Sequence, residues 1–366
     1  MNILLIEPYY TGSHKSWAED LQNFSSNKIK ILSMKGQFWK WRMHGGAITL
    51  AQKFNEMDIE PDLIIATDML DLTTFLSLTR KKTSRIPTIM YFHENQLSYP
   101  WSTKDRDFID KKHKHFGFIN YSSALAADQV LFNSNYHKES FFNELKLLLK
   151  NSPDHNELST IEIIKEKSKV LYIGLNLKRF NHFTTKNEGP PLLLWNHRWE
   201  YDKNPEMFFN VLFNLNQAGI DFRIAILGEK FNKYPSIFNL AKEKLKDKVI
   251  HFGYCNSIEE YAQWLWKADI LPVTNYQDFF GISIMEAIYC NTYPILPNRL
   301  SYPELLPLEY HTEHIYNNEN DLLNKLKFAI KNIDTIRKLK FKKIALPYDW
   351  SNMKNNYDQL LLSFIK

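Results

Sequence analysis

The sequence predicts an α/β protein built from two Rossmann-like, doubly wound domains. Its 366 residues suffice for two domains of about 150 residues each, the usual domain size. Short β-rich apolar runs alternate with amphipathic helical patterns, which is typical of βαβ units and a parallel sheet. The alternation stops at Gly189-Pro190-Pro191 and then resumes, so this segment is typical of a linker.

The first half carries one complete βα series. Apolar runs predict strands at Asn2–Glu7, Ile29–Leu32, Leu63–Thr67, Thr88–Phe92, Gln129–Phe132 and Val170–Ile173. Amphipathic patterns predict helices at Trp17–Phe24, Ala47–Phe54, Leu72–Leu78 and Ile119–Ala127. The polar, charged segment Asn151–Lys169 is interpreted as a surface insertion.

The second half repeats this organisation. Strands are predicted at Leu192–Trp195, Arg223–Leu227, Val249–Phe252, Ile270–Val273 and Tyr293–Leu296. Helices are predicted at Pro205–Gln217, Ser236–Leu245, Ile258–Lys267, Ile282–Tyr289, within Asp321–Lys343 and at Trp350–Lys366. We expect the two domains to face a cleft, with the chemistry in the loops at the carboxyl ends of the strands.

Composition narrows the class of protein. Apolar residues make up 44% and charged residues 24%, as in folded soluble proteins. No apolar run approaches the roughly 20 residues of a membrane span, and the N-terminus is predicted to be a strand rather than a signal peptide. Two cysteines, Cys255 and Cys290, exclude a disulfide framework and favour the cytoplasm. The net charge of +5 permits a polyanionic partner without requiring one.

Several common motifs are missing. Without Gly-x-Gly-x-x-Gly, a dinucleotide oxidoreductase or a Rossmann methyltransferase is disfavoured, and without a P-loop so is nucleotide hydrolysis. Asp105-Arg106-Asp107 matches an Asp-x-Asp metal motif, but so short a match arises by chance in a charged chain. We interpret it as solvated loop charge and expect no metal.

A basic loop, Asn196–Pro205, follows the first strand of the second half. Arg198 and Lys203 lie five residues apart in it. Two fixed cations at the carboxyl end of a strand can clamp a diphosphate and stabilise the charge that it gains on leaving. The alternative is surface pairing of these cations with Glu200 and Asp202.

Two acidic residues flank the start of the helix predicted at Ile282–Tyr289. Gly281 allows a ligand to approach the backbone closely, and the positive end of the helix attracts an anion. Asp278 precedes the helix and Glu286 lies eight residues further on, so one carboxylate can bind sugar hydroxyls and the other a ribose. The alternative is a helix-start acid and an ordinary surface glutamate.

Two loops of the first half also carry candidates. His93-Glu94-Asn95 follows the strand Thr88–Phe92, where His93 can hydrogen-bond a sugar hydroxyl or simply be structural. Thr11-Gly12-Ser13-His14 predicts a tight turn of small residues where substrate comes near, or a plain βα turn.

Together these residues resemble the GT-B glycosyltransferases of the large retaining family 4. In that family an Arg and a Lys bind the nucleotide diphosphate, and a Glu-x7-Glu motif binds the donor sugar and the ribose. Arg198, Lys203, Asp278 and Glu286 occupy the matching places. Asp278 departs from the usual Glu, keeping the charge but shortening the reach by one methylene.

The chain resembles the tRNA-queuosine α-mannosyltransferase family more closely still. The matching blocks are Gly12–Lys15, Phe92–Leu97, Phe132–Ser134, Asn196–Pro205 and Leu300–Glu304. The resemblance implies cytoplasmic, metal-independent transfer of mannose from GDP-mannose to the cyclopentenediol of queuosine in a tRNA anticodon loop, with retention and without a cofactor.

It also implies a domain layout and roles for residues. We expect an acceptor-side domain over residues 1–188, a nucleotide-sugar-binding domain over 189–346, and a C-terminal helix, 347–366, that packs on the first domain. The predicted catalytic residues are Arg198, Lys203, His93 and Asp278. The predicted donor contacts are Gly12, Asn196, Tyr254, Phe280, Gly281, Ile282, Ser283 and Glu286. The predicted acceptor contacts are Ser13, His14, Trp39, Lys40, Trp41, Arg42, Glu94 and Asn95.

Evidence for RNA in the residues themselves is limited to a few basic runs. Trp39–His44 interleaves aromatics that can stack on bases with cations that can meet phosphates, or is a half-buried loop. Arg80–Lys82 and Lys111–His115 add positive charge but can be solvated helix faces, and Arg337–Lys343 is expected to face water from a helix.

Two rival functions stay open, as do the hexose, the nucleotide base and the oligomeric state. The first rival is a GT-B enzyme with an envelope polysaccharide or lipid acceptor. It would use the amphipathic stretch Lys138–Lys150 for peripheral membrane contact. The second is a catalytically silent RNA-binding protein with a relic donor site.

Overall fold

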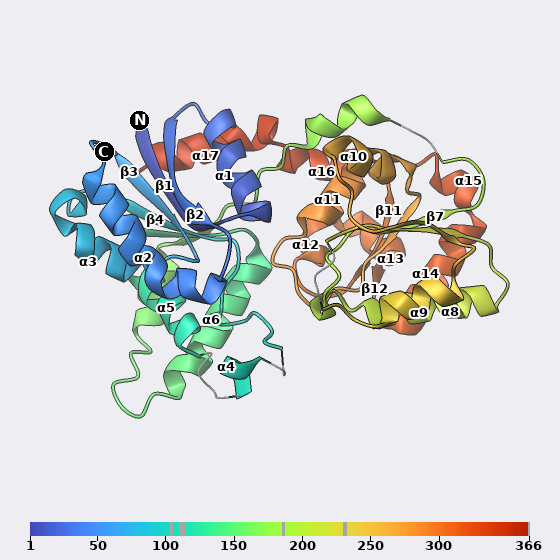
Figure 1. The fold of residues 1–366 in the computed structure, drawn as a ribbon, viewed down its shortest axis with the longest axis horizontal. Coiled ribbons are helices and arrows are strands. Elements are labelled where there is room, and N and C mark those ends of the chain that lie inside the picture. Colours follow the sequence, from blue (N-terminus) through green and yellow to red (C-terminus); the bar gives the residue numbers. More distant parts are fainter. Residues whose placement is uncertain (103–104, 110–113, 185–186, 230–232, 365–366) are drawn as a thin grey trace. The chain divides into compact units, whose positions relative to one another are not determined.

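The computed structural model describes residues 1–102, 105–109, 114–184, 187–229 and 233–364. The chain divides into two compact units, which we call unit 1 (Met1–Leu175 and Trp350–Lys366) and unit 2 (Asn176–Asp349). Each unit contains one six-stranded parallel sheet covered by helices (Figure 1). The predicted fold class, a two-domain α/β protein, is confirmed.

Unit 1 has the strand order β2-β1-β3-β4-β5-β6. Its strands are β1 (Asn2–Tyr10), β2 (Lys28–Lys35), β3 (Leu63–Thr67), β4 (Thr88–Phe92), β5 (Gln129–Phe132) and β6 (Ser168–Val170). Its helices are α1 (Gly12–Phe24), α2 (Trp39–Glu56), α3 (Leu72–Thr83), α4 (Arg106–Ile109), α5 (Lys114–Ala126), α6 (Asn135–Lys150), α7 (Thr160–Glu166) and α17 (Trp350–Leu362).

Unit 2 has the strand order β12-β11-β10-β7-β8-β9. Its strands are β7 (Leu192–Trp195), β8 (Arg223–Ile226), β9 (Val249–Phe252), β10 (Ile270–Pro272), β11 (Tyr293–Pro297) and β12 (Ile315–Tyr316). Its longer helices are α8 (Pro205–Gln217), α9 (Ile237–Lys244), α10 (Ile258–Lys267), α11 (Ile282–Tyr289) and α14 (Glu319–Lys331). Short ones are η1 (Leu177–Phe183), η2 (Tyr201–Lys203), α12 (Tyr302–Leu305), η3 (Leu308–Tyr310), α13 (His311–His314), α15 (Ile333–Ile336), α16 (Lys342–Ala345) and η4 (Leu346–Tyr348).

Alternate strand residues build the two faces of the unit 1 sheet. Leu4 and Phe92 face a core that also contains Phe54 from α2 and Phe75 from α3. The intervening residue Tyr91 stacks on the other face against Trp17 of α1, with ring centroids 4.6 Å apart. Because successive side chains of a strand point to opposite faces, continuous apolar strands bury both sides of a doubly wound sheet.

Local capping sets where some helices begin. Ser134 caps α6 by accepting a hydrogen bond from the amide of His137 at 3.0 Å, and Asp71 caps α3 in the same way from Thr74. Such caps satisfy backbone N–H groups that the first helical turn leaves without partners.

The predicted boundary at 188/189 differs from the observed one at 175/176. Gly189-Pro190-Pro191 is not a free linker, because the Gly189 carbonyl accepts a hydrogen bond from Arg337 at 2.8 Å. The helix η1, which precedes this segment in the chain, also contacts unit 2, because the Trp266 indole donates a hydrogen bond to the Phe180 carbonyl at 2.7 Å. Residues 347–349 also stay with unit 2, where Asp349 accepts from the Leu177 amide at 3.1 Å.

The last helix packs on unit 1, as predicted. Trp350 of α17 is fully buried against Gly174 and lies parallel to Phe24 of α1. The Tyr357 hydroxyl of α17 donates to the Tyr172 carbonyl at 2.9 Å and accepts from the Trp17 indole at 3.1 Å.

Several predicted elements need correction. The segment 151–169 is only partly a surface insertion, since Ile161 and Ile164 of α7 are buried and Ser168 begins the edge strand β6. Helix α2 begins eight residues before the predicted Ala47. The helices predicted within Asp321–Lys343 correspond to α14, α15 and the start of α16, whereas the two-residue strand β12 was missed.

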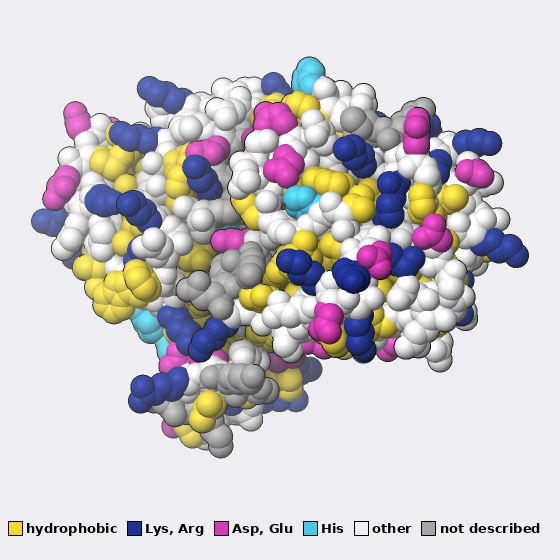
Figure 2. All heavy atoms as spheres, turned by 45° about the vertical axis from the view of Figure 1, so that its right-hand side comes forward, with side chains coloured by type: hydrophobic (Ala, Val, Ile, Leu, Met, Phe, Trp, Pro, Cys, Tyr) yellow, Lys and Arg dark blue, Asp and Glu magenta, His cyan; other side chains and the backbone are white. Residues whose placement is uncertain are grey.

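On the face drawn in Figure 2, the Lys and Arg side chains of the described residues are scattered among Asp and Glu and form no single large basic patch. None of the described helices is long and apolar enough to cross a bilayer. The apolar side of α6, which includes Phe141 and Leu145, lies in the core of unit 1. That stretch is therefore a core helix and not a membrane-docking face.

We predict that Trp350→Ala lowers the free energy of unfolding by about 3–5 kcal/mol, because it leaves a large cavity among packed side chains. The measurement is the shift of the urea unfolding transition. The matched control Leu362→Ala, on the same helix but 55% exposed, should change it by less than about 0.5 kcal/mol. Equal effects of the two variants would contradict the packing of α17.

Candidate functional site

Strand order identifies the places where ligands should bind. In unit 1 the chain switches direction across the sheet between β1 and β3, and in unit 2 between β7 and β10. Ligands of open α/β sheets bind outside the carboxyl ends of the strands at such switch points. The residues that follow these strands are the ones predicted to carry the chemistry.

Lys203 is the buried cation of the loop after β7. Only 6% of the residue is exposed. Its ammonium contacts Asp278 Oδ1 at 3.0 Å, Asp202 Oδ2 at 3.2 Å and the Gln277 carbonyl at 2.6 Å. Burial alone would lower the pKa of Lys203, but the two carboxylates outweigh it and raise the pKa above its usual value. Lys203 is therefore a buried cation that donates hydrogen bonds to Asp278 and to the Gln277 carbonyl and lies within ion-pair distance of Asp202.

Asp278 is held at both of its oxygens. Besides the contact of Oδ1 with Lys203, Oδ2 accepts hydrogen bonds from Asn275 Nδ2 and from the Tyr302 hydroxyl, each at 2.6 Å. Burial alone would raise the pKa of Asp278, but the Lys203 ammonium and these hydrogen bonds lower it. The carboxylate predicted to face a sugar thus serves, in this structure, to hold the lysine.

Arg198 is the accessible cation of the same loop. Its side chain is 48% exposed and pairs with Glu200 at 3.2 Å. The neighbouring backbone is tightly enclosed, because a Cβ on Gly228 would lie 1.9 Å from the His197 carbonyl oxygen. Trp199 anchors the loop by stacking on Phe238, with ring centroids 4.4 Å apart. The loop therefore presents Arg198 from a fixed base.

Glu286 is also engaged by protein groups. Its Oε1 accepts a hydrogen bond from Arg179 at 2.7 Å, and its Oε2 accepts from the Tyr261 hydroxyl at 2.9 Å. The residue is 7% exposed. A carboxylate can accept more than two hydrogen bonds, so Glu286 keeps capacity for a ribose.

The start of α11 connects these loops. Gly281 has a φ of +105°, a conformation that favours glycine, and it precedes the first helical turn. The Asn196 amide donates to the Ser283 carbonyl at 2.8 Å, and the Ser283 hydroxyl lies 3.3 Å from His197 Nδ1. Ile282 is half-buried beside them.

Three predicted donor residues are not part of this network, and one of them, Gly12, begins α1 of unit 1. Phe280 is buried, with its ring against Tyr348. Tyr254 lies 65% exposed in the loop after β9.

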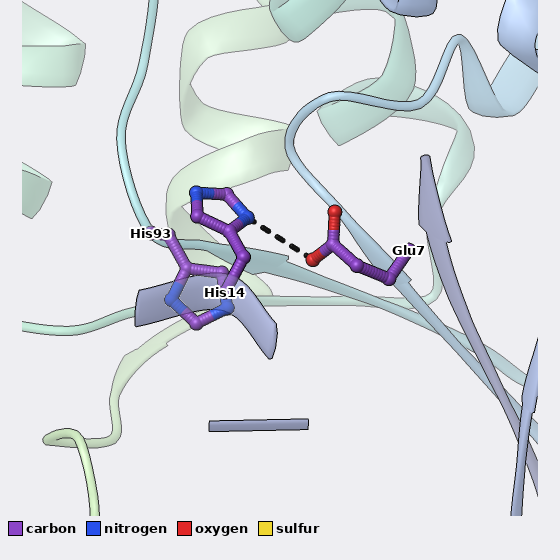
Figure 3. A group of neighbouring side chains, drawn as sticks. All are labelled: Glu7, His14 and His93. Atoms are coloured by element: carbon purple, nitrogen blue, oxygen red, sulfur yellow. Dashed lines mark hydrogen bonds and ion pairs between the residues drawn. The ribbon is translucent and has the colours of Figure 1, made fainter. Parts of the chain in front are cut away.

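Unit 1 places Glu7, His14 and His93 together, as Figure 3 shows. His14 Nδ1 lies 3.0 Å from Glu7 Oε2, and the two imidazole rings are 4.4 Å apart. Burial alone would lower the pKa of His14, but the Glu7 carboxylate, aided by Asp68 and Glu94, raises it to about 9. His14 is therefore charged at neutral pH. It lies in the first turn of α1, because that helix begins at Gly12 rather than at the predicted Trp17.

His93 is neutral and rigidly held. Its amide donates to Asp68 Oδ1 at 2.8 Å, and its carbonyl accepts from Asn133 at 2.9 Å. Burial, together with His14 and His137, places its pKa well below the usual value. Its Nε2 is buried and has no partner among the described residues. A buried imidazole nitrogen left without a partner is a place where a ligand group can bind.

The residues after His93 divide into two roles. Asn95 is fully buried and closes its own loop by accepting from the amides of Leu97 and Ser98 at 3.1 and 2.9 Å. Its side chain is therefore used inside the protein. Glu94 is half-buried and accepts from Gln96 at 2.8 Å.

The basic aromatic run is not a loop but the first turns of α2. Lys40, predicted to meet phosphates, is held by Asp105 at 2.8 Å and by Asp107. The Asp-x-Asp pair is thus not solvated charge. Arg42 is buried and donates to the Lys35 carbonyl at 3.1 Å. Trp41 is exposed, whereas Trp39 lies partly buried among other rings.

The other basic runs are mostly structural or solvated. Lys82 donates to the carbonyls of Asn55 and Met57 at the end of α2. Positions 111–113 lie outside the described residues. Arg337 pairs with Asp269 at 2.9 Å, and residues 338–341 are not helical, in contrast to the prediction.

Two groups of described residues bring three possible metal ligands within 4.8 Å of one another. In the group of Glu7, His14 and His93, a hydrogen bond already joins two of the ligand atoms. In the group of His251, Cys255 and Glu260, the glutamate accepts from the Asn256 amide at 3.0 Å.

Sequence reasoning missed three residues that hold the acidic groups: Arg179, Tyr261 and Tyr302. Tyr302 lies inside the block Leu300–Glu304, so the block itself was a signal, although nothing in it specified a role. Arg179 and Tyr261 lie 107 and 25 residues from Glu286, and no local pattern reveals such contacts.

The fold and these sites define a GT-B glycosyltransferase. Residues 178–343 match the family model for glycosyl transferases group 1. Among solved structures, sucrose-phosphate synthase from Thermosynechococcus elongatus has a TM-score of 0.72 at 13% identity over 100% of this chain and 99% of that one. Anabaena HepE, in complex with UDP and glucose, has a TM-score of 0.66 at 14% identity over 99% and 100%.

The particular family follows from two further matches. Residues 2–175 match the family model described as tRNA-queuosine alpha-mannosyltransferase N-terminal. A tRNA-queuosine alpha-mannosyltransferase from Drosophila melanogaster is 36% identical over 336 residues, which are 89% of this chain and 86% of the relative. The chain belongs to the tRNA-queuosine alpha-mannosyltransferase family. The resemblance inferred from the sequence is confirmed, while the roles of individual residues stay predictions.

We predict that Glu7→Gln lowers the pKa of His14 from its value of about 9, because the carboxylate that contributes most against the effect of burial is then gone. The measurement is an NMR titration of the His14 ring. Since the pKa is raised in the folded state, the stabilisation from this pair is fully present below pH 6.5 and is lost as the pH rises through about 9.

The titration of His44, which lies outside this cluster, should be the same in the two proteins. A His14 midpoint that stays near 9 in the variant would show that Glu7 is not the source of the shift.

Proposed function

We propose that this protein transfers mannose from GDP-mannose to a hydroxyl of the queuosine cyclopentenediol in a tRNA anticodon loop, in the cytoplasm, with retention and without a metal. Membership of the family supports the acceptor and the sugar. The observation that carries the chemistry is the arrangement at the β7/β10 switch point, where the accessible Arg198 stands beside the buried cation Lys203.

On the donor side, the diphosphate binds between Arg198 and the start of α11. Both supply positive charge where the leaving group becomes more negative. A diphosphate oxygen replaces one of the three protein oxygens that the Lys203 ammonium contacts. Glu286, fixed by Arg179 and Tyr261, accepts the ribose hydroxyls.

In the transfer step, the bond between the sugar C1 and the diphosphate oxygen breaks. The acceptor oxygen forms its bond to C1 on the same face, which retains the configuration. The acceptor proton passes to the departing diphosphate, so that the products are GDP and mannosyl-queuosine. Arg198 and Lys203 are in place before the reaction, and they stabilise the negative charge that develops on the departing diphosphate. A metal ion performs this task in other transferases.

On the acceptor side, His93 and His14 supply opposite hydrogen-bonding character. His93 is neutral, with a free buried Nε2 that can bond to a sugar hydroxyl. His14 is a cation whose Nδ1 is taken by Glu7, so its Nε2–H is a fixed donor. Thr11, Gly12 and Ser13, at the start of α1, are exposed and leave room for the acceptor beside these histidines.

We predict that Arg198→Ala lowers the rate of mannose transfer by about 10²–10³, as expected for the loss of one preorganised contact with developing charge. The assay uses labelled GDP-mannose and queuosine-containing tRNA. Arg85→Ala, which removes an exposed arginine of unit 1, is the control and should leave the rate unchanged. A rate within about threefold of wild type for Arg198→Ala would reject the clamp.

A second prediction concerns the substrates. Labelled mannose should pass from GDP-mannose to tRNA that contains queuosine, and not to the same tRNA with guanosine at that position. UDP-glucose should not replace the donor, and excess EDTA should leave the rate unchanged. Equal labelling of both tRNAs would eliminate this acceptor, and full loss of activity in EDTA would eliminate the metal-independent step.

A further inference from the structure

Two large aromatic side chains stand exposed at the beginning of α2. Phe38 is 75% exposed and Trp41 is 63% exposed. Burying aromatic side chains is favourable, so an exposed pair of them on a folded protein marks a contact surface more often than an isolated exposed side chain does. We call Phe38 and Trp41 the α2 platform.

The backbone holds Phe38 in an unusual conformation. Its φ is +54°, in the left-handed region that bulky residues rarely adopt. The Phe38 carbonyl accepts the first helical hydrogen bond from the Arg42 amide at 3.0 Å, and the Arg42 side chain ties back to the Lys35 carbonyl at 3.1 Å. Backbone strain of this kind persists where the surroundings enforce it, and it is frequent at functional sites.

A glycine one turn later fixes the orientation of Trp41. A Cβ on Gly45 would lie 2.7 Å from Cε2 and Cζ2 of the Trp41 indole. The indole therefore rests against the helix at Gly45, while the rest of the ring stays accessible.

The base of the platform is packed. Trp39, between the two exposed residues in sequence, packs with Trp101 and Phe116 at ring-centroid distances of 5.5 and 5.2 Å. Met43, one turn further on, is fully buried in the same cluster. The start of α2 is thus a firm support, which lowers the entropy that the aromatics lose on binding a ligand.

The platform adjoins the candidate acceptor site. A Cβ on Gly36 would lie 2.2 Å from Thr11 Cγ2, so the segment leading to Phe38 runs against the residue before Gly12. Tyr9 packs in the cluster that contains Trp39, and its ring lies 6.1 Å from that of His14. A polymer bound at His14 can therefore continue onto the platform.

We propose that Phe38 and Trp41 stack on unpaired bases of the tRNA anticodon loop next to the modified nucleotide. This inference rests on the proposed function and adds the surface that holds the acceptor. Unpaired bases are recognised by stacking on aromatic faces, and the exposed Lys35, three residues before Phe38, adds a cation that suits a phosphate backbone. A membrane surface is the competing partner for exposed aromatics, and the test separates the two.

The experiment measures binding of a queuosine-containing anticodon stem-loop by fluorescence anisotropy at several salt concentrations. Trp41→Ala and Phe38→Ala should each weaken binding by about 5- to 150-fold, the range for one base–aromatic stack. The slope of log affinity against log salt should stay the same, because no phosphate contact is lost. Phe328→Ala, at a side chain of unit 2 that is 56% exposed, should bind like wild type.

Two further variants exclude a folding defect. Trp41→Phe should recover part of the affinity. Gly45→Ala keeps the indole but forces it to move, and it should weaken binding while the helix stays intact, since alanine is the better helix former. Stabilisation of the fold by GDP-mannose should be unchanged in every variant, because the donor contacts of the proposed function belong to unit 2 and the platform belongs to unit 1.

Wild-type affinity in both Trp41→Ala and Phe38→Ala would overturn the platform while leaving the proposed function intact, provided that the wild type transfers mannose to the stem-loop. A wild type that neither binds nor mannosylates the stem-loop would instead reject the proposed function. Binding of the wild type to phosphatidylglycerol vesicles, lost in these variants while RNA binding persists, would assign the platform to a membrane.

Discussion

A single buried charge organises the loops at the switch point of unit 2. The Lys203 ammonium is almost completely removed from water, and a charge in that position is tolerated only when fixed oxygens surround it. Asp278 and Asp202 supply two of these oxygens, which couples the loop after β7 to the loop after β10. Asp278 in turn binds Tyr302 of α12. Segments that are distant in sequence are thereby held together at the β7/β10 switch point. The loop after β7, which carries Arg198, is therefore fixed in position.

The sequence predicted most of the sheet and little of what holds the sites. Strands such as Thr88–Phe92 were predicted to the residue because an apolar run buried on both faces is a local signal. Arg198 and Lys203 were singled out by their spacing in the loop after a strand, and the structure places both in the loop after β7, while their roles stay predictions. Arg179 could not be found in this way, because its contact with Glu286 spans 107 residues and depends on tertiary packing alone.

The errors share a physical cause. Gly189-Pro190-Pro191 has the composition of a linker, but Arg337, far along the chain, binds the Gly189 carbonyl and keeps the segment in unit 2. The run Trp39–His44 was interpreted either as an RNA contact or as a half-buried loop, and in the structure it forms the first turns of α2. Its helical state is stabilised from outside, by packing of Trp39 and by the pairing of Lys40 with Asp105. Local composition predicts an element poorly where long-range contacts decide its conformation.

The aspartate that replaces the usual family glutamate at position 278 is consistent with this internal pairing. A side chain shorter by one methylene keeps its carboxylate close to its own loop, within 2.6 Å of Asn275 only three residues earlier. The same short reach lets one oxygen meet Lys203 while the other meets Tyr302. A longer glutamate would carry its charge outward, towards a bound sugar. The short side chain is thus used to hold the lysine, and in the proposed function it leaves more of the sugar recognition in unit 2 to the Gly281 backbone.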